Sequence, residues 1–511
     1  MAAGQRGSFA APRSIRSLSL AASTALFPDQ IPNWIDGRER PARSGESFEK
    51  LNPADGRILC SVARSALNDI DQAVGVARKA QTEWANLPAV RRGMLLHAVV
   101  TVLKQERARI ARIVALETGK SYANTLGETD GAIELGLFFA GEGQRLYGRT
   151  TTSGTPHRYA MTVRQPLGVA GLIVAANTPI ANVAWKVFPA LICGNTAILK
   201  AAEDTPATAW VFAQLAHGAG LPAGVLNVVQ GYGEEAGAAL VAHRDRDIIS
   251  FTGSTAVGRR IGAIAGERLT RVSLELGGKN PFVVCDDADL ESAAKWVLLS
   301  AFSNAGQRCA AASRIIIFDS IYEKFRAMIV ERAERLNVGP SDDDDLGPVI
   351  NEKQLNAMIC AVDAARQRGA KVLAGGHRLT DTEHKDGFYL APTFLEAIDP
   401  HDELSTTELF GPIACLYPAK DFASALAMAN DSPYGLTACI HTRSLDRAVE
   451  FTHKVHAGVA VVNAGTYGSE PHMPFGGLKQ SGNGSREPGT EALDVYSALK
   501  DVYINVSPAA L

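Results

Sequence analysis

The chain has 511 residues, of which 46% are hydrophobic and 21% charged, a composition typical of a folded globular protein with two or three domains. Its formal net charge of -3 gives it no basic character, which argues against nucleic acid or an anionic membrane as a partner. No apolar run approaches the ~18 residues of a membrane-spanning helix.

The first 28 residues differ from the rest of the chain. They contain arginine and serine but no acidic residue, a composition that resembles a mitochondrial targeting segment. The favoured interpretation is an over-extended N-terminus on a bacterial protein, and in neither case does the segment belong to the core. The seven cysteines are scattered and form no CxxC pair, so we expect neither a disulfide framework nor a zinc site, and a reducing compartment. The expected location is the cytoplasm, with the mitochondrial matrix as the alternative.

Helical periodicity dominates the first third of the chain. Apolar residues recur at helical spacing over 71–84, over 91–118 and over 129–146, and Gly119 is a typical helix stop. These three segments are predicted helices.

Buried strands then alternate with helices. The predicted strands are 169–174, 196–200, 224–229, 247–251 and 272–276, and the helices between them are 206–218, 233–242 and 256–267. This alternation predicts a parallel sheet with right-handed crossovers, whose ligands bind at the carboxyl ends of the strands.

A second α/β pattern follows, with a helix over 288–303, a strand over 314–318 and a helix over 320–336. The four acidic residues 342–345 have two interpretations, a metal site and a solvated loop. We favour the solvated loop and predict no metal site.

Two candidate cofactor-binding groups follow predicted strands. Gly253 and Ser254 lie where a strand ends and a helix opens, a place where free N–H groups suit an anion, although a purely structural turn is the alternative. Lys200 and Glu203 lie at another strand end. They suit the hydroxyls of a ribose, and the carboxylate would repel a 2′-phosphate, which favours NAD over NADP. A surface salt bridge is the alternative.

Three residues have the chemistry of a nucleophilic site. Cys309 stands among small residues beside the cation of Arg308, although a buried cysteine is most often a small hydrophobic residue. Glu275 precedes a Gly-Gly turn and suits a general base, or is merely an exposed carboxylate. The amide of Asn177 suits an oxyanion, or caps a turn.

Together these motifs resemble the aldehyde dehydrogenase superfamily over about residues 30–505. The resemblance rests on Asn177, Trp185-Lys186, Lys200-Ala-Ala-Glu203, Phe251-Thr-Gly-Ser-Thr255, Glu275-Leu-Gly-Gly-Lys279, Gly306-Gln-Arg-Cys309, Glu408-Leu-Phe-Gly-Pro412 and Pro474-Phe-Gly-Gly477. It implies an α/β protein with a Rossmann-like dinucleotide-binding domain (29–147 and 166–275), an α/β catalytic domain (276–482) and a small β oligomerisation arm (148–165 and 483–511), after an N-terminal extension (1–28).

The resemblance also implies a mechanism. Cys309 would attack a small aldehyde, with the oxyanion held by the Asn177 side chain and the Cys309 N–H, and hydride transfer to NAD would leave a thioester. Glu275 would activate the water that releases the acid. Arg308 and Lys186 would lower the pKa of the thiol.

Further roles follow from the resemblance alone. Lys200, Glu203 and Glu408 would bind the two riboses, Phe410 would pack near the nicotinamide, and Ser254 would contact the pyrophosphate. Glu487 matches a family acid near the proton exit, although here an extra serine precedes Arg486 and Glu487. The family's arm pairs across subunits, which implies a homodimer or homotetramer.

The substrate is the least determined feature. Arg308 suits a carboxylate, phosphate or sulfonate, or else forms an ion pair that supports the loop. Succinate-semialdehyde dehydrogenases carry arginines where this chain has Trp185 and Ser303, so other small anionic or neutral aldehydes are preferred. Trp185 and Tyr467 are the other expected substrate contacts. The rival functions are a CoA-acylating dehydrogenase, which Glu275 opposes, and a non-catalytic dinucleotide-binding oligomer.

Overall fold

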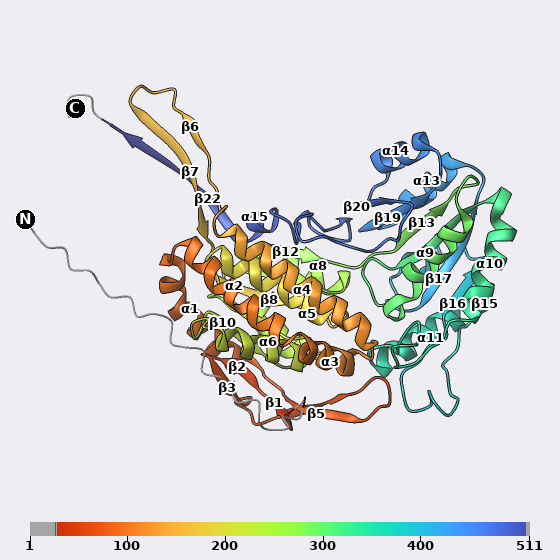
Figure 1. The fold of residues 1–511 in the computed structure, drawn as a ribbon, viewed down its shortest axis with the longest axis horizontal. Helices are drawn as coiled ribbons and strands as arrows, with labels where there is room; N and C mark the ends of the chain where they lie inside the picture. The colour runs from red at the N-terminus through yellow and green to blue at the C-terminus, as the bar shows by residue number, and fades with distance from the viewer. Residues whose placement is uncertain (1–25, 27, 507–511) are drawn as a thin grey trace, which may run out of the picture.

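The structure, a computed structural model, describes residue 26 and residues 28–506 (Figure 1). Its first large sheet has seven strands in the order β12-β11-β8-β9-β10-β2-β3. The five parallel strands are those predicted: β8 (Val169–Ile173), β9 (Thr196–Lys200), β10 (Leu226–Val229), β11 (Ile248–Thr252) and β12 (Arg271–Glu275). Two short antiparallel strands, β2 (Asn33–Ile35) and β3 (Arg38–Arg40), complete one edge.

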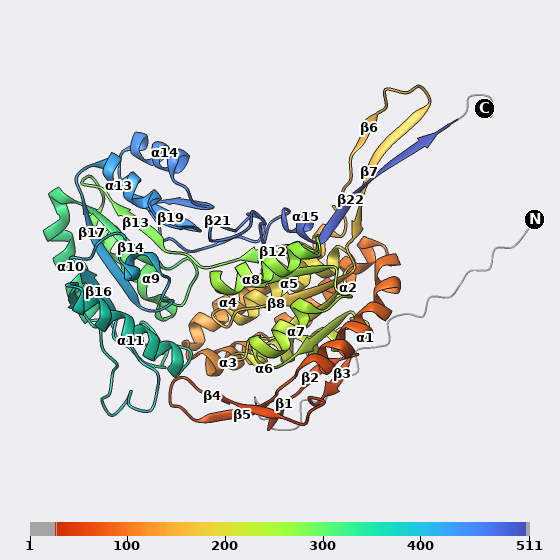
Figure 2. The ribbon, with the colours of Figure 1, turned by 180° about the vertical axis from the view of Figure 1, so that it is seen from behind.

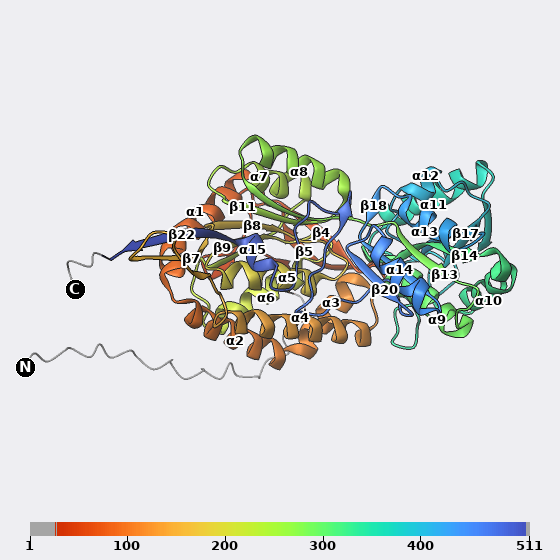
Figure 3. The same ribbon diagram turned by 90° about the horizontal axis from the view of Figure 1, so that it is seen from above.

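Helices cover both faces of this sheet (Figure 3). One side carries α1 (Leu67–Asn86), α7 (Ala238–Ala242) and α8 (Thr255–Glu267), and the other carries α5 (Pro179–Ile192) and α6 (Pro206–Gly218) under α2 (Ala89–Gln105), α3 (Arg107–Thr118) and α4 (Tyr122–Glu142). Strands β8, β9 and β10 are buried along their whole length, because both faces are covered.

Three helix predictions need correction. The single helix predicted over 91–118 is two helices, α2 and α3, since the backbone leaves helical geometry at Glu106. Helix α4 begins at Tyr122, earlier than predicted, because Ser121 caps it by accepting a hydrogen bond from the Asn124 N–H. The helix predicted over 233–242 consists of one turn of π-helix, Gly233–Gly237, followed by the short α-helix α7.

The second large sheet has the order β15-β16-β17-β14-β13-β19-β20. Its strands are β13 (Asn280–Val284), β14 (Ala312–Phe318), β15 (Lys371–Ala374), β16 (Thr393–Glu396), β17 (Ile413–Ala419), β19 (Thr437–His441) and β20 (Val459–Val462). All are parallel except β15. Its longer helices are α9 (Leu290–Phe302), α10 (Tyr322–Glu334), α11 (Glu352–Gln367), α13 (Phe422–Asn430) and α14 (Leu445–Lys454). The predicted second α/β unit is thus confirmed.

A three-stranded antiparallel arm projects from the body of the molecule (Figure 2). It consists of β6 (Thr150–Thr152), β7 (Arg158–Pro166) and β22 (Ser497–Asn505). The residues just before β22 form the short helix α15 (Ala492–Tyr496), which contacts α5 and β12 of the body. The domain boundaries themselves remain a proposal.

Smaller elements complete the fold. Strands β1 (Gln30–Ile31), β4 (Ser47–Leu51) and β5 (Ile58–Ala63) form a separate sheet, and β18 (Tyr434–Gly435) pairs with β21 (Leu478–Lys479). Helix α12 (Glu403–Thr406) and the 3-10 turns η2 (Ser303–Gly306) and η3 (Asp319–Ile321) are single turns.

Several predictions about unusual segments can be compared with the structure. The predicted extension 1–28 lies almost entirely outside the described residues. All seven cysteines are free. The acidic run lies in a loop whose carboxylates accept backbone N–H groups, including Asp342 from Ala123 at 3.0 Å. Within the described ranges there is no metal-ligating group of three acidic, histidine or cysteine residues, and no helix long and apolar enough to cross a membrane.

Candidate active site

Cys309 lies on a tightly folded loop between η2 and β14. The backbone φ angles of Asn304, Ala305 and Gly306 are all positive, at 56°, 51° and 66°. A Cβ at Gly306 would collide with the carbonyl of Gly411, so only glycine fits there. The strained loop therefore lies directly against the segment that carries Glu408 and Phe410.

Side-chain donors fix the backbone around the cysteine. Asn280, the first residue of β13, donates its amide to the carbonyls of Cys309 at 2.7 Å and Ala311 at 2.9 Å. The Thr466 hydroxyl donates to the Ala310 carbonyl at 2.6 Å. The thiol is thus carried by a backbone that is held from two sides.

Burial, together with the carboxyls of Glu408 and Glu275, raises the pKa of the Cys309 thiol to about 12. A hydrogen bond from the Ala310 N–H and the charge of Arg308 act in the opposite direction but are outweighed. The predicted effect of Arg308 is thus present, since its charge lowers the pKa of the thiol, but burial and the carboxyls raise that pKa overall. The thiol is neutral and needs a base before it can attack.

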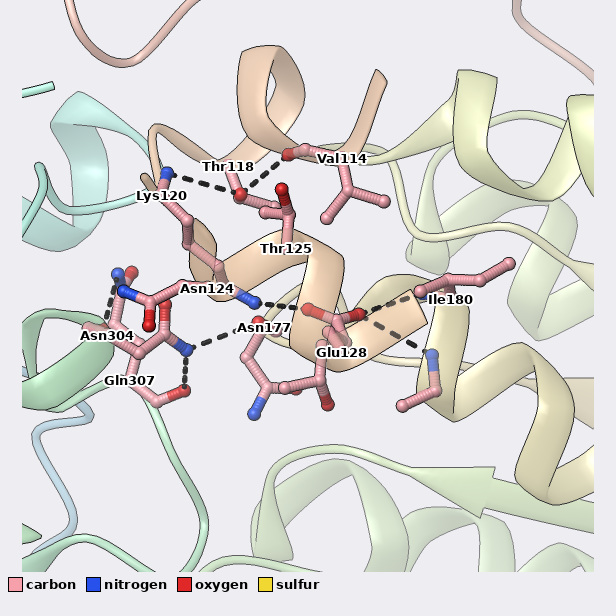
Figure 4. A network of polar contacts seen from close by, with 12 residues as sticks. Val114, Thr118, Lys120, Asn124, Thr125, Glu128, Asn177, Ile180, Asn304 and Gln307 are labelled. Carbon is pink, nitrogen blue, oxygen red and sulfur yellow. Dashed lines mark hydrogen bonds and ion pairs between the residues drawn. The ribbon is translucent and has the colours of Figure 1, made fainter. Parts of the chain in front are cut away.

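The Asn177 side chain is oriented to donate. Asn177 lies in the turn between β8 and α5, and its Oδ1 accepts from the Asn182 Nδ2 at 3.1 Å. The Asn304 side chain donates to the Asn177 carbonyl at 3.2 Å, which joins this turn to the cysteine loop (Figure 4). With its oxygen occupied, the Asn177 amide nitrogen is left to donate its protons to an oxyanion.

Glu275 ends β12 as a buried carboxyl whose two oxygens have no hydrogen-bond partner. Burial raises its pKa well above the ordinary value; the charge of Glu487 adds to this, and Lys186 and Arg486 oppose it. A buried carboxyl without partners destabilises the fold, so its presence indicates a functional group whose partner is a substrate or a water.

Lys186 and Glu487 form a buried ion pair behind Glu275. The Lys186 Nζ lies 2.9 Å from Glu487 Oε2 and 2.6 Å from the Ser250 hydroxyl. The other Glu487 oxygen accepts from Ser250, Ser273 and Tyr496 at 2.9–3.0 Å. The Lys186 ammonium is thus held by Glu487, and its charge lowers the pKa of Glu275, while its predicted effect on Cys309 stays a prediction.

The predicted cofactor residues gather at the carboxyl ends of β9 and β11. Lys200 Nζ lies 2.7 Å from Glu203 Oε2, with the Lys200 side chain 2% exposed and that of Glu203 42% exposed. A Cβ at Gly253 would collide with the Phe251 ring, and Ser254 caps α8 by accepting from the Val257 N–H. The buried Lys200 ammonium and the half-exposed Glu203 carboxylate suit the hydroxyls of a ribose, and the N-terminus of α8 suits the pyrophosphate of a dinucleotide.

Glu408 lies against the Gly-Gly turn that follows β12, on the segment that also carries Phe410. Its Oε1 accepts from the Gly278 N–H at 3.0 Å, and burial raises its pKa to about 7 against the effects of that bond and Lys279. A Cβ at Gly277 would collide with its carboxyl, which explains the first glycine of the Gly-Gly turn. The neighbouring Phe410 has a positive φ of 55°.

Arg308 and Tyr467 meet beside the cysteine. The guanidinium carbon lies 4.5 Å from the centre of the Tyr467 ring, and the Arg308 Nε is buried without a partner. Trp296 packs edge-on to Tyr467 at 6.4 Å, and Trp185 packs edge-on to Phe475 at 5.3 Å. Of the predicted substrate residues, Trp185 and Tyr467 thus each lie in an aromatic pair. The third, Arg308, keeps a guanidinium nitrogen without a hydrogen-bond partner.

The sequence reasoning missed the residues that hold the site in place. Asn280 and Asn304 stand just outside two of the quoted motifs, and nothing in the sequence says which carbonyls they bind. Lys120 and Glu128, which form a buried ion pair at 2.7 Å beside the Asn177 turn, belong to no motif (Figure 4).

Comparison with known proteins agrees with this geometry. The profile of the aldehyde dehydrogenase family matches residues 40–502. The chain is 37% identical to the α-ketoglutaric semialdehyde dehydrogenase of Bacillus subtilis, over 92% of this chain and 97% of that protein, and 38% identical to the α-ketoglutarate semialdehyde dehydrogenase of Haloferax volcanii, over 93% and 99%. The betaine aldehyde dehydrogenase of Staphylococcus aureus, solved with NAD⁺, superposes with a TM-score of 0.91 at 31% identity, over 94% and 95%.

The chain belongs to the aldehyde dehydrogenase family. It is an enzyme that oxidises an aldehyde to the carboxylic acid with a nicotinamide dinucleotide as the oxidant, which confirms the predicted class and fold.

Proposed function

We propose that Cys309 is the nucleophile, Glu275 the general base and Asn177 the oxyanion donor of this dehydrogenase. The observation that carries the proposal is the buried Glu275 carboxyl with both oxygens free, in the same cluster as a neutral thiol and a free amide. Ionised Glu275 takes the thiol proton when sulfur attacks the carbonyl carbon. After that proton has passed to solvent, the carboxylate takes the proton of the attacking water. The Asn177 amide stabilises the negative oxygen in both steps.

The cofactor is proposed to be NAD rather than NADP. Lys200, Glu203 and Ser254 would hold its adenosine ribose and pyrophosphate, and Glu408 and Phe410 its nicotinamide end. Bound NAD supplies the hydride acceptor for the carbon attached to sulfur. Burial raises the pKa of the Glu203 carboxyl, but Lys200 and nearby N–H groups together outweigh it and hold that pKa below the usual value, so the ionised Glu203 repels a 2′-phosphate. The ratio of kcat/KM for NAD to that for NADP tests this, and a ratio below one would contradict it.

The substrate is proposed to be a small anionic aldehyde, such as a semialdehyde with a carboxylate. Arg308 has an unpartnered, buried nitrogen beside the nucleophile, and two similar proteins are named for α-ketoglutarate semialdehyde. A carboxylate would complete the hydrogen bonding of the guanidinium while Tyr467 holds its face.

The test is NADH formation on size-matched neutral, carboxylated, phosphorylated and sulfonated aldehydes. Arg308→Ala should remove the preference for anionic aldehydes, by about 10-fold or more in kcat/KM, since a charge-assisted hydrogen bond contributes about 1.5–3 kcal/mol. Arg308→Lys, which keeps the charge but not the planar fork, should recover part of it. Equal losses on neutral and anionic aldehydes would contradict the proposal and assign Arg308 to the loop.

The assembly is proposed to be a homodimer or homotetramer formed through the arm. Apolar residues are exposed on both faces of the arm, among them Tyr159, Leu499, Tyr503 and Ile504.

The proposed compartment is the cytoplasm. The mitochondrial matrix is the alternative, because the first 28 residues are rich in arginine and serine and lack acids. Fractionation of cells expressing the full chain decides between the two.

A further inference from the structure

Two helices of the first sheet, α5 and α6, begin directly after the turns that carry the oxyanion donor and the ribose-binding pair. Helix α5 follows the Asn177 turn and α6 follows the turn with Lys200 and Glu203. Neither helix is capped by its own N-cap side chain, Thr178 or Thr205. Their first N–H groups are met instead by carboxylates from the outer helices.

Glu128 of α4 supplies the cap of α5. Its Oε1 accepts from the N–H groups of Ile180 at 3.1 Å and Ala181 at 3.5 Å, and its Oε2 lies 2.7 Å from the Lys120 ammonium (Figure 4). The side chains of Lys120 and Glu128 are each 7% exposed, so water screens this pair little.

Glu117 of α3 supplies the cap of α6 in the same way. Its two oxygens accept from the N–H groups of Ala207 at 2.7 Å and Thr208 at 3.0 Å, and from the Thr208 hydroxyl at 2.6 Å. The residue is fully buried, and the buried Lys50 is the nearby cation.

Several other helices in the described part of the chain are capped locally. Helices α8, α9, α11, α13 and α14 each begin with a serine, aspartate or asparagine that accepts the N–H three residues on. Helices α5 and α6 are capped instead by carboxylates from α4 and α3. Their preceding turns carry the oxyanion donor and the ribose-binding pair.

Short chain segments and hydrogen bonds connect the start of α5 to Asn177 and the start of α6 to Glu203. Asn177 lies three residues before Ile180, and Asn182 of the same helix holds the Asn177 Oδ1 at 3.1 Å. Glu203 lies four residues before Ala207, and the intervening turn is closed by the Thr205 N–H on the Ala202 carbonyl. A shift of either helix start therefore moves a site residue.

We propose that Glu128 and Glu117 are positioning residues, Glu128 for the Asn177 amide and Glu117 for the Lys200–Glu203 pair. This inference rests on the roles proposed above for Asn177, Lys200 and Glu203. It assigns to two adjacent outer helices, α3 and α4, separate control of oxyanion stabilisation and of dinucleotide binding.

The test compares two matched substitutions in the full-length enzyme, Glu128→Gln and Glu117→Gln. Each substitution keeps the size of the side chain but replaces one accepting oxygen with an NH₂ group, which is a donor. That NH₂ group then faces another donor, either the N–H groups of the helix start or the neighbouring Lys120 ammonium or Thr208 hydroxyl. Because small displacements of catalytic groups carry large kinetic costs, Glu128→Gln should lower the NADH burst rate and kcat/KM for the aldehyde by about 10-fold, with KM for NAD within about twofold.

Glu117→Gln should give the opposite pattern, with KM for NAD raised about 5-fold and the burst rate at saturating NAD within about twofold, because it displaces the ribose-binding turn and not the oxyanion donor. Both variants should lower the thermal midpoint, so stability alone does not separate them. If both lose activity only in proportion to the fraction folded, or change the same kinetic constant, the inference is overturned.

A double-mutant cycle with Asn177→Ala completes the test. Glu128→Gln should change the burst rate of Asn177→Ala by less than about twofold, because the group it positions is gone. A full, additive loss in that background would overturn the inference and leave the role of Asn177 standing. An Asn177→Ala enzyme with wild-type burst rate would overturn both.

Discussion

At the scale of single residues, burial raises the pKa of both Cys309 and Glu275, and the carboxyls near the thiol also act to raise its pKa. A protonated thiol cannot attack an aldehyde, and a protonated carboxyl cannot take its proton. Ionisation of Glu275 is therefore the event that activates the site, with Lys186 as the buried cation that favours it.

Glu275→Gln should lower kcat and remove the increase of activity with pH. In the wild type the carboxyl must lose its proton, and its pKa is raised, so activity grows as pH rises through that value. Profiles of kcat against pH for both proteins measure this. A Gln variant that keeps the wild-type profile would contradict the role of Glu275.

The same substitution should affect stability with a defined sign. The native state binds this proton more tightly than the unfolded chain, so the free energy of unfolding falls as pH rises above ~4.3, the value of an exposed carboxyl, towards the raised native pKa. Glu275→Gln removes that loss and should raise the thermal midpoint at neutral pH. Thermal unfolding between pH 5 and 8 checks the prediction, and a variant that is less stable throughout would refute it.

At the scale of elements, the loop from η2 to β14 depends on Gly306. Gly306→Ala puts a Cβ against the Gly411 carbonyl at a φ of 66°, so we expect a loss of about 1–3 kcal/mol in unfolding free energy and at least 10-fold in kcat/KM. Gly369→Ala is the control: its φ is 102° but nothing lies within 4 Å of the new Cβ, so it should lose stability and keep activity. Equal activity in both variants would contradict this account of the loop.

The same elements show how far the sequence could be interpreted. The strands β8–β12 and the motif residues at their ends were predictable, because buried apolar runs and motif order are local signals. The break at Glu106 and the early start of α4 were not, since both depend on tertiary packing and on a single cap. Nor was the pairing of Lys186 with Glu487, which are 301 residues apart.

At the scale of the whole molecule, the arm has unpaired strand edges and exposed apolar side chains that a partner would cover. Leu499 and Tyr503 share one face of β22, at 56% and 61% exposed. We expect Leu499→Lys with Tyr503→Lys to shift the enzyme from a dimer or tetramer towards the monomer. Light scattering measures the change.

Leu269→Lys is the control for that experiment, because Leu269 is 94% exposed in the turn before β12 and belongs to the body. It should leave the assembly unchanged. A wild-type protein that is monomeric at micromolar concentration would refute the assembly proposed for the arm.

The most direct test of the whole account is to trap the acyl-enzyme. Glu275→Gln is mixed with aldehyde and NAD, quenched with acid, digested and analysed by mass spectrometry. The account predicts a thioester on the peptide that contains Cys309, formed in step with one equivalent of NADH per active site but more slowly than in the wild type, because the thiol proton must pass to solvent and the hydrolytic water is left without its base. A burst of NADH with the acyl group on another residue, or with no covalent adduct, would contradict Cys309 as the nucleophile.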